Sequence, residues 1–133
     1  MLATRSKEKR VKYYELKVPE DSAEALAKIL DESKTHPVLV FKKSPICVVI
    51  RAAEQELRRY LTSREGASKL GLVMIDVLRQ RSLALGLSEQ LGVRHESPQA
   101  FILESGELQW HGSHGTLTLE TFRDKIEKTE TPG

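Results

Sequence analysis

The stretch KKSPICVVIRAAEQEL, residues 42–57, joins two different hydrophobic patterns. The apolar run VLVF at 38–41 leads into it and is typical of a buried central strand. After the join, apolar residues recur at helical spacing from about residue 45 to residue 62. Cys47, the only cysteine in the chain, lies where the predicted strand is followed by the predicted helix.

The position of Cys47 permits two interpretations. Unpaired N–H groups and the positive end of the helix dipole favour a thiolate in the first turn of a helix. The thiolate is the nucleophilic form, so Cys47 would be exposed and reactive in disulfide exchange, with a pKa below that of a free thiol. The apolar neighbours Ile46, Val48 and Val49 favour the opposite, a small buried hydrophobic residue with a raised pKa.

The length of 133 residues suits one domain, which we expect to span 1–133 with flexible ends at 1–10, which is basic, and at 129–133. No apolar run approaches the ~20 residues that cross a bilayer, and no secretory signal is visible, so we expect a cytoplasmic protein. The net charge of +2 argues against a nucleic-acid partner. A lone cysteine excludes an internal disulfide and the usual structural zinc site.

Strand and helix patterns alternate along the rest of the chain. We expect strands at 13–18, 37–43, 70–78 and on both sides of the turn ESGE within 99–112, and helices at 19–34, 45–62, 80–92 and 116–128. Asp21 and Thr118 are predicted N-caps, and Gly92 a C-cap. The order β-α-β-α-β-α-β-β-α predicts an α/β fold, with a mixed central sheet and helices on both faces.

This order, with a cysteine after the second strand, resembles the thioredoxin fold. The resemblance implies that the Ser97–Pro98 peptide bond is cis, faces Cys47 and presents backbone groups to an extended substrate. It also implies that His114 lies on the loop that returns to the active site. Phe41 stands in place of the buried acid of thioredoxins, and Asp76 is expected to be a turn residue.

Three motifs carry a closer resemblance, to the monothiol bacilliredoxin family. Lys42, Ser44 and Cys47 match the family pattern K-x-S-T-x-C-P-I-S, VRHESPQ at 93–99 matches in full, and WHGSH at 110–114 matches W-H-x-S-H. The resemblance spans about residues 21–128. The sequence departs from the first pattern at Pro45, Val48 and Ile50, where the family has threonine, proline and serine.

The family resemblance implies a thioredoxin-like, monothiol thiol–disulfide exchange protein of bacteria that use bacillithiol. Cys47 would be the nucleophile, bacillithiol the co-substrate without any further cofactor, and S-bacillithiolated proteins and a redox partner protein the partners. The substrate-binding residues would be Ser44, Ile46, Ser97, Pro98 and His114.

Two other functions remain open. Val48 and Ile50 favour a thioredoxin-like binding module that recognises a redox partner without turnover. Cys47, His111 and His114, with His95, could instead form a metal site, although the histidine spacing is a weak signal. A set of basic side chains could pair with a carboxylate, but we interpret them as surface residues in salt bridges: Lys42, Lys43, Arg51 and Arg94.

Overall fold

The computed structural model describes residues 13–44, 48–64 and 69–130. The elements, in chain order, are β1 (Tyr13–Glu15), α2 (Ser22–Glu32), β2 (Val38–Lys43), α3 (Val48–Ser63), β3 (Leu70–Asp76), α4 (Arg81–Leu91), β4 (Gln99–Glu104), β5 (Glu107–Ser113), the short 3-10 helix η1 (His114–Thr116) and α5 (Leu119–Glu130). The order of strands and α-helices is the one that the hydrophobic patterns predict.

The five strands form one mixed sheet in the order β1-β3-β2-β4-β5. The strands β1, β3 and β2 are parallel, because a helix connects each to the next along the chain. The strand β4 pairs antiparallel with β2, and the β4–β5 hairpin closes through the left-handed residues Ser105 and Gly106. As a result, the carboxyl ends of β2 and β5 and the amino end of β4 lie at the same edge of the sheet.

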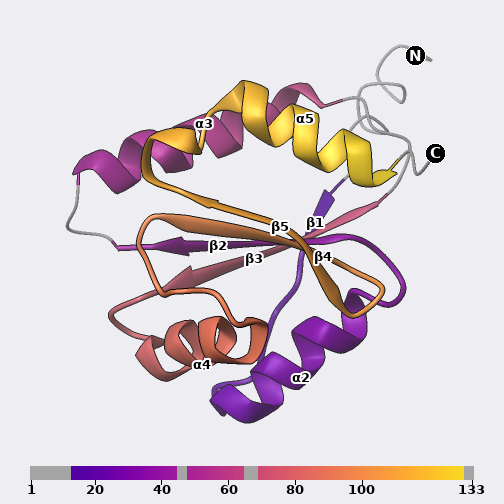
Figure 1. Cartoon of the computed structure of the whole chain (residues 1–133), viewed down its shortest axis with the longest axis vertical. Helices are drawn as coiled ribbons and strands as arrows, with labels where there is room; N and C mark the ends of the chain where they lie inside the picture. The colour runs from indigo at the N-terminus through magenta and orange to yellow at the C-terminus, as the bar shows by residue number, and fades with distance from the viewer. Residues whose placement is uncertain (1–12, 45–47, 65–68, 131–133) are drawn as a thin grey trace, which may run out of the picture.

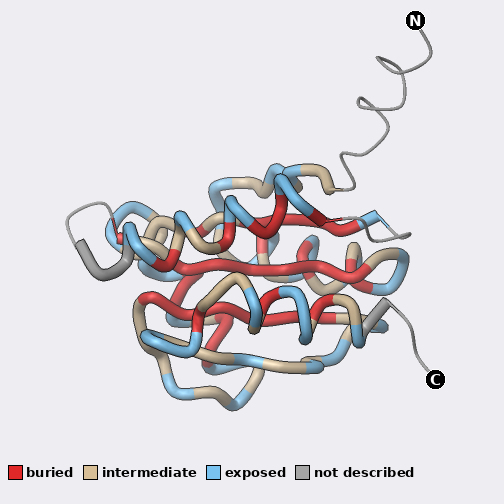
Figure 2. Tube along the Cα trace, turned by 90° about the horizontal axis from the view of Figure 1, so that it is seen from above, coloured by how far each residue is buried: buried red, intermediate tan, exposed pale blue. Residues whose placement is uncertain are grey.

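Helices cover both faces of the sheet, with α3 and α5 on one side and α2 and α4 on the other (Figure 1). Each face has its own apolar core, in which Leu57 and Phe122 belong to one side, and Ile29 and Leu87 to the other. Figure 2 shows the buried segments running through the middle of the molecule, between more exposed outer segments. Because both of its faces are covered, β2 is buried from Val38 to Lys42.

Local signals mark the helix ends as predicted. The Asp21 carboxylate accepts a hydrogen bond from the Glu24 N–H at 2.9 Å, and the Thr118 hydroxyl accepts one from the Thr121 N–H at 3.2 Å. Gly92 ends α4 with a φ of 69°, a left-handed conformation that suits glycine. The three predicted caps are confirmed.

Some boundaries differ from the predicted ones. β1 ends at Glu15 and β3 at Asp76, each before the last apolar residues of the predicted strand. Leu16, Val18 and Val77 pack against the α2–α4 core, whereas Leu78 is exposed. The helix α5 continues through Glu130 and takes in the first two residues of the expected C-terminal tail. The rest of that tail and the basic stretch 1–10 lie outside the described residues. Among the helices that the structure describes, none is long and apolar enough to span a bilayer.

Candidate functional site at the carboxyl edge of the sheet

Antiparallel pairing brings three of the predicted site segments to one edge of the sheet. In this register Lys42 of β2 lies opposite Gln99 of β4, and Gln99 lies opposite Ser113 of β5. Ser44 follows Lys42 by two residues, Ser97 precedes Gln99 by two, and His114 comes directly after Ser113. The structure therefore gathers Ser44, Ser97 and His114 at this edge.

The central residue of the predicted site falls in a short gap. Cys47 and Ile46 lie outside the described residues, so their predicted exposure, pKa and contacts remain predictions. The neighbouring segments are clear, because Ser44 is 8% exposed at the end of β2 and α3 begins at Val48. Phe41, in the place of the thioredoxin acid, is fully buried in the core beneath α3 and α5.

The Ser97–Pro98 peptide bond is cis, as predicted, and leads directly into β4. Its placement beside Cys47 stays a prediction. Among the residues that the structure describes, Ser97 forms no hydrogen bond through its backbone N–H or C=O, and its buried Oγ has no partner either. Buried polar groups without partners are rare, so each calls for an explanation.

Glu96 connects this loop to the end of β5. Its Oε1 accepts a hydrogen bond from the Ser113 hydroxyl at 2.5 Å and lies 3.2 Å from Nε2 of His114. The Ser113 hydroxyl, and then the nearby His114 and Arg94, lower the pKa of the Glu96 carboxyl below its ordinary value. The His114 N–H donates to the Pro98 carbonyl at 3.1 Å, which holds the residue with a left-handed φ of 55°.

Gln99 secures the same loop from the first position of β4. The side chain is 2% exposed, its Nε2 donates to the Arg94 carbonyl at 2.8 Å, and its Oε1 accepts from the Glu96 N–H at 3.2 Å. One amide thus supplies a donor and an acceptor to backbone groups on either side of His95. The backbone of the loop is therefore held on both sides of His95, while Ser97 has no hydrogen bond among the described residues.

Lys42 corrects one interpretation of the sequence. We expected it at the surface, but its side chain is fully buried on the α4 side of the sheet. Its Nζ donates to Ser88 Oγ at 2.6 Å, lies 2.9 Å from Nδ1 of His95, and sits 5.1 Å from the centre of the Phe101 ring. The expectation was wrong because Lys42 alternates with the α3-facing residues of a strand that helices cover on both faces.

Burial governs the protonation of this pair. It lowers the pKa of Lys42 to about 8, and it is also the main cause that lowers the pKa of His95, followed by the charges of Lys42 and Arg81. The other three basic residues of that set differ from Lys42: Lys43 is partly exposed at 3.9 Å from Glu54, and Arg51 and Arg94 are exposed.

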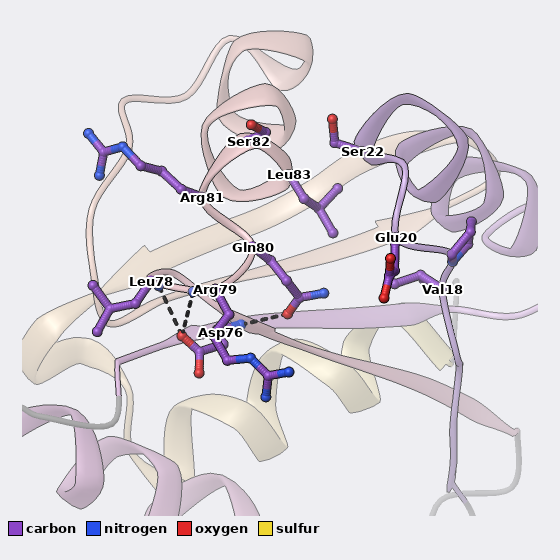
Figure 3. Close-up of a pocket in the computed structure, with 11 residues that line it drawn as sticks. Val18, Glu20, Ser22, Asp76, Leu78, Arg79, Gln80, Arg81, Ser82 and Leu83 are labelled. Carbon is purple, nitrogen blue, oxygen red and sulfur yellow. Dashed lines mark hydrogen bonds between the residues drawn. The ribbon is translucent and has the colours of Figure 1, made fainter.

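Asp76 is a turn residue, as predicted. Its Oδ1 accepts hydrogen bonds from the backbone N–H groups of Leu78 and Arg79, which connects β3 to the start of α4. Asp76 lines a cleft of about 760 Å³. Figure 3 shows the residue between this turn and the residues that lead into α2. The cleft lies at the carboxyl ends of β1 and β3, the same edge as the candidate site.

Within the described residues, no three side chains of histidine, aspartate or glutamate converge as a metal site would require. His114 is bonded to Glu96, and His95 to Lys42 on the other side of the loop. His111 lies on β5 and is exposed. Because Cys47 lies outside the described residues, a metal site that includes it is not tested.

Comparison with known proteins decides the family. Residues 19–122 match the family described as monothiol bacilliredoxin. The chain belongs to this family. Among solved structures, it is similar to a thioredoxin-fold protein provisionally described as an oxidoreductase, at 25% identity and a TM-score of 0.67, with 86% of this chain and 93% of that chain covered.

Two thioredoxins extend the comparison of the fold. A mutant thioredoxin from Halobacterium salinarum is 15% identical, with a TM-score of 0.64 and coverage of 93% of this chain and 96% of that one. A thioredoxin from Fasciola hepatica is 14% identical, with a TM-score of 0.58 and coverage of 89% and 95%. The fold of this monothiol bacilliredoxin family member is thus thioredoxin-like, and its role lies in thiol–disulfide redox chemistry.

The family motifs meet in space at this site. The motif VRHESPQ supplies His95, Glu96 and Gln99, and WHGSH supplies Ser113 and His114. The sequence pointed to His114 and Ser97, gave no role to Glu96 or Gln99, and placed Lys42 at the surface. All three are polar residues within the family motifs, which could have marked them as candidates. Membership of a motif does not show which side chains bond to one another.

Proposed function

We propose that this protein removes bacillithiol from S-bacillithiolated proteins through a mixed disulfide on Cys47. The observation that carries the proposal is the match of residues 19–122 to the monothiol bacilliredoxins, a segment that contains the only cysteine of the chain. A cysteine that must stay reduced between turnovers suits a reducing cytoplasm.

The chemistry follows from having one thiol. The Cys47 thiolate attacks the sulfur of bacillithiol in the substrate disulfide, so that a new Cys47–bacillithiol disulfide forms and the client cysteine leaves as a thiolate. A second small thiolate, or the thiol of a partner reductase, then attacks the bacillithiol sulfur and releases Cys47 as a thiolate. Both steps are exchanges, so the number of disulfides is unchanged. The second thiol is the reductant, because it leaves as a mixed disulfide with bacillithiol while the client cysteine is reduced.

The loop before β4 supports the binding of a client chain. Ser97 has both backbone hydrogen-bonding groups unused among the described residues, and it lies at the edge of the sheet that the Cys47 segment follows. An extended polypeptide can pair with such groups as an added strand does. Ser97 and Pro98 would then bind the client, Ser44 and Ile46 would lie beside bacillithiol, and His114 would border the groove.

The departures from the family pattern define the main alternative. Val48 and Ile50 replace residues of the family motif, so a protein that binds a redox partner without exchanging its thiol is the competing function. The two functions differ in one observable, because only exchange transfers a small thiol to Cys47.

A mass-spectrometric transfer assay tests the proposal. The reduced protein is incubated with a client protein that carries one bacillithiol disulfide, with Cys47→Ser as the control and a glutathionylated client as the second arm. We expect Cys47 to gain one bacillithiol as the client gains one free thiol, faster than with glutathione, and no transfer to Cys47→Ser. A stable complex without transfer would establish the binding module, and equal rates for both small thiols would overturn the bacillithiol specificity.

A further inference from the structure

Polar side chains from three separate elements meet beneath the loop before β4. Lys42 comes from β2, Ser88 from α4 and His95 from the loop itself, and Lys42 Nζ lies 2.6 Å from Ser88 Oγ and 2.9 Å from His95 Nδ1. Lys42 is fully buried and Ser88 is 4% exposed, whereas His95 is partly exposed. The cluster therefore joins the central strand and α4 to a loop at the edge of the fold.

The hydrogen bond sets the chemical state of His95. Below its pKa of about 8, Lys42 is an ammonium group with only donors, so Nδ1 of His95 accepts and the ring is neutral with its proton on Nε2. Burial acts in the same direction, as does the positive charge of Arg81 on α4, while the neighbouring Glu96 opposes it. His95 is thus held in one tautomer by a residue 53 positions away.

Burying the ammonium group of Lys42 in this cluster costs desolvation free energy. Among the described residues, no carboxylate lies within ion-pair distance of Lys42, so its buried charge is balanced only by a hydroxyl, an imidazole and an aromatic ring. An apolar side chain of similar length would avoid the cost of desolvating an ammonium group. Stability of the core therefore gives no reason for a lysine here, whereas the attachment of His95 does.

The attachment completes the support of the loop. Gln99 holds the backbone of Arg94 and Glu96, Glu96 bonds to Ser113, and Lys42 holds the ring between them. Without the Lys42 bond, His95 would have no partner on β2, the strand that leads to Ser44. We infer, on the basis of the proposed function, that Lys42 is a positioning residue for thiol exchange, because its bond to His95 holds the loop that presents Ser97 to the client chain.

The first test needs no variant. Nitrogen and carbon NMR shifts of the His95 ring report which nitrogen carries the proton. We expect the Nε2–H tautomer between pH 6 and 7 in the wild type, where Lys42 is charged, and uptake of a second proton at a higher pH in Lys42→Met. An Nδ1–H tautomer in the wild type would overturn the inference directly.

The second test separates positioning from packing. We expect Lys42→Met to unfold at an equal or higher urea concentration, yet to show a KM for the bacillithiolated client raised about fivefold or more, with little change in Cys47 alkylation by iodoacetamide. Lys28→Met, on the exposed surface of α2, is the matched control and should leave KM unchanged. His95→Asn, which keeps an acceptor near the Nδ1 position, should lose less affinity than His95→Leu.

The outcomes distinguish the two hypotheses. A wild type that transfers no bacillithiol overturns the proposed function. A wild type that transfers it, together with a folded Lys42→Met that has the same KM, overturns the role of Lys42 alone. Equal losses in His95→Asn and His95→Leu would also overturn it, because the acceptor would then be irrelevant.

Discussion

The Nζ atom of Lys42 lies 2.9 Å from Nδ1 of His95, although 53 positions of sequence separate the two residues. This contact ties the central strand of the sheet to the loop that precedes β4. A buried ammonium group bonded to neutral partners has consequences for stability as well as for the site.

Lys42 should make the free energy of unfolding change with pH in the alkaline range. Its pKa is about 8 in the folded protein and 10.5 ordinarily, so between these values the unfolded chain holds a proton that the folded one has lost. The free energy of unfolding from this group therefore rises from pH 8 to 10.5, by on the order of 3 kcal/mol, and is constant below pH 8. Urea unfolding from pH 7 to 10 should show Lys42→Met losing stability relative to the wild type as the pH rises, and a constant difference would contradict this.

Glu96 should contribute stability that disappears in acid. Its pKa is lowered in the folded protein, first by the Ser113 hydroxyl, so its contribution is complete above the ordinary value of 4.5 and is lost as the pH falls through the folded pKa. Urea midpoints measured from pH 3 to 6 should fall less steeply in Glu96→Gln than in the wild type. Glu89→Gln, on the exposed face of α4, is the control, and it should follow the wild-type curve.

Gly112 is required by the tryptophan of the third motif. A Cβ atom at this position would lie 2.5 Å from Cζ2 of Trp110, so Gly112→Ala must displace the indole ring. We expect a loss of about 1–3 kcal/mol in the free energy of unfolding and a changed Trp110 fluorescence spectrum. The control is Gly115→Ala, because no described atom lies within 4 Å of its added Cβ. Equal behaviour of the two variants would exclude a packing role for Gly112.

Ser97→Ala should not destabilise the protein. Its buried Oγ has no partner among the described residues, and an unsatisfied buried hydroxyl costs on the order of 1 kcal/mol. Thermal unfolding is therefore expected at the wild-type temperature or slightly above it. A clear drop in that temperature would mean that the hydroxyl has a partner in the folded protein.

His114 is expected to assist the thiol. His114 comes directly after β5, and its ring is bonded to Glu96. The carboxyl end of β5 lies at the same edge of the sheet as the carboxyl end of β2, which precedes Cys47. An imidazolium near a thiol favours the thiolate, so His114→Ala should slow iodoacetamide alkylation of Cys47 at pH 6 to 7 by roughly two- to fivefold. An unchanged curve of rate against pH would leave His114 with a purely structural role.

The order of strands and helices could be predicted because each element is indicated by residues that are close together in the sequence. The alternation of strand and helix, the caps at Asp21 and Thr118 and the left-handed Gly92 each depend on a few neighbouring residues. The burial of Lys42 depends instead on Ser88 and His95, which follow it in the sequence by 46 and 53 positions. A lysine at the end of an apolar run looks like the end of a strand, and only the packing of α4 shows that it is covered.

The site was predicted in part for the same reason. The motifs identified the segments around Ser97 and His114, and antiparallel pairing of β4 with β2 and β5 brings them together. The bonds of Glu96 to Ser113 and His114 cross between two motifs, so neither motif alone contains them. Side-chain partners across a turn depend on register. The residues of β4 are apolar on both faces and show no alternation from which the register could be predicted.

The strand order also determines when the site is complete during synthesis. β2 lies between β3 and β4, and β4 begins only at Gln99. At about 5–20 residues per second, a ribosome needs several seconds to extend the nascent chain from Cys47 to His114. Throughout that interval the growing polypeptide carries its only thiol before the loop that precedes β4 and the β4–β5 hairpin have been made. Under the proposed function, a nascent chain would therefore acquire its client-binding surface only when β4 and β5 join the sheet.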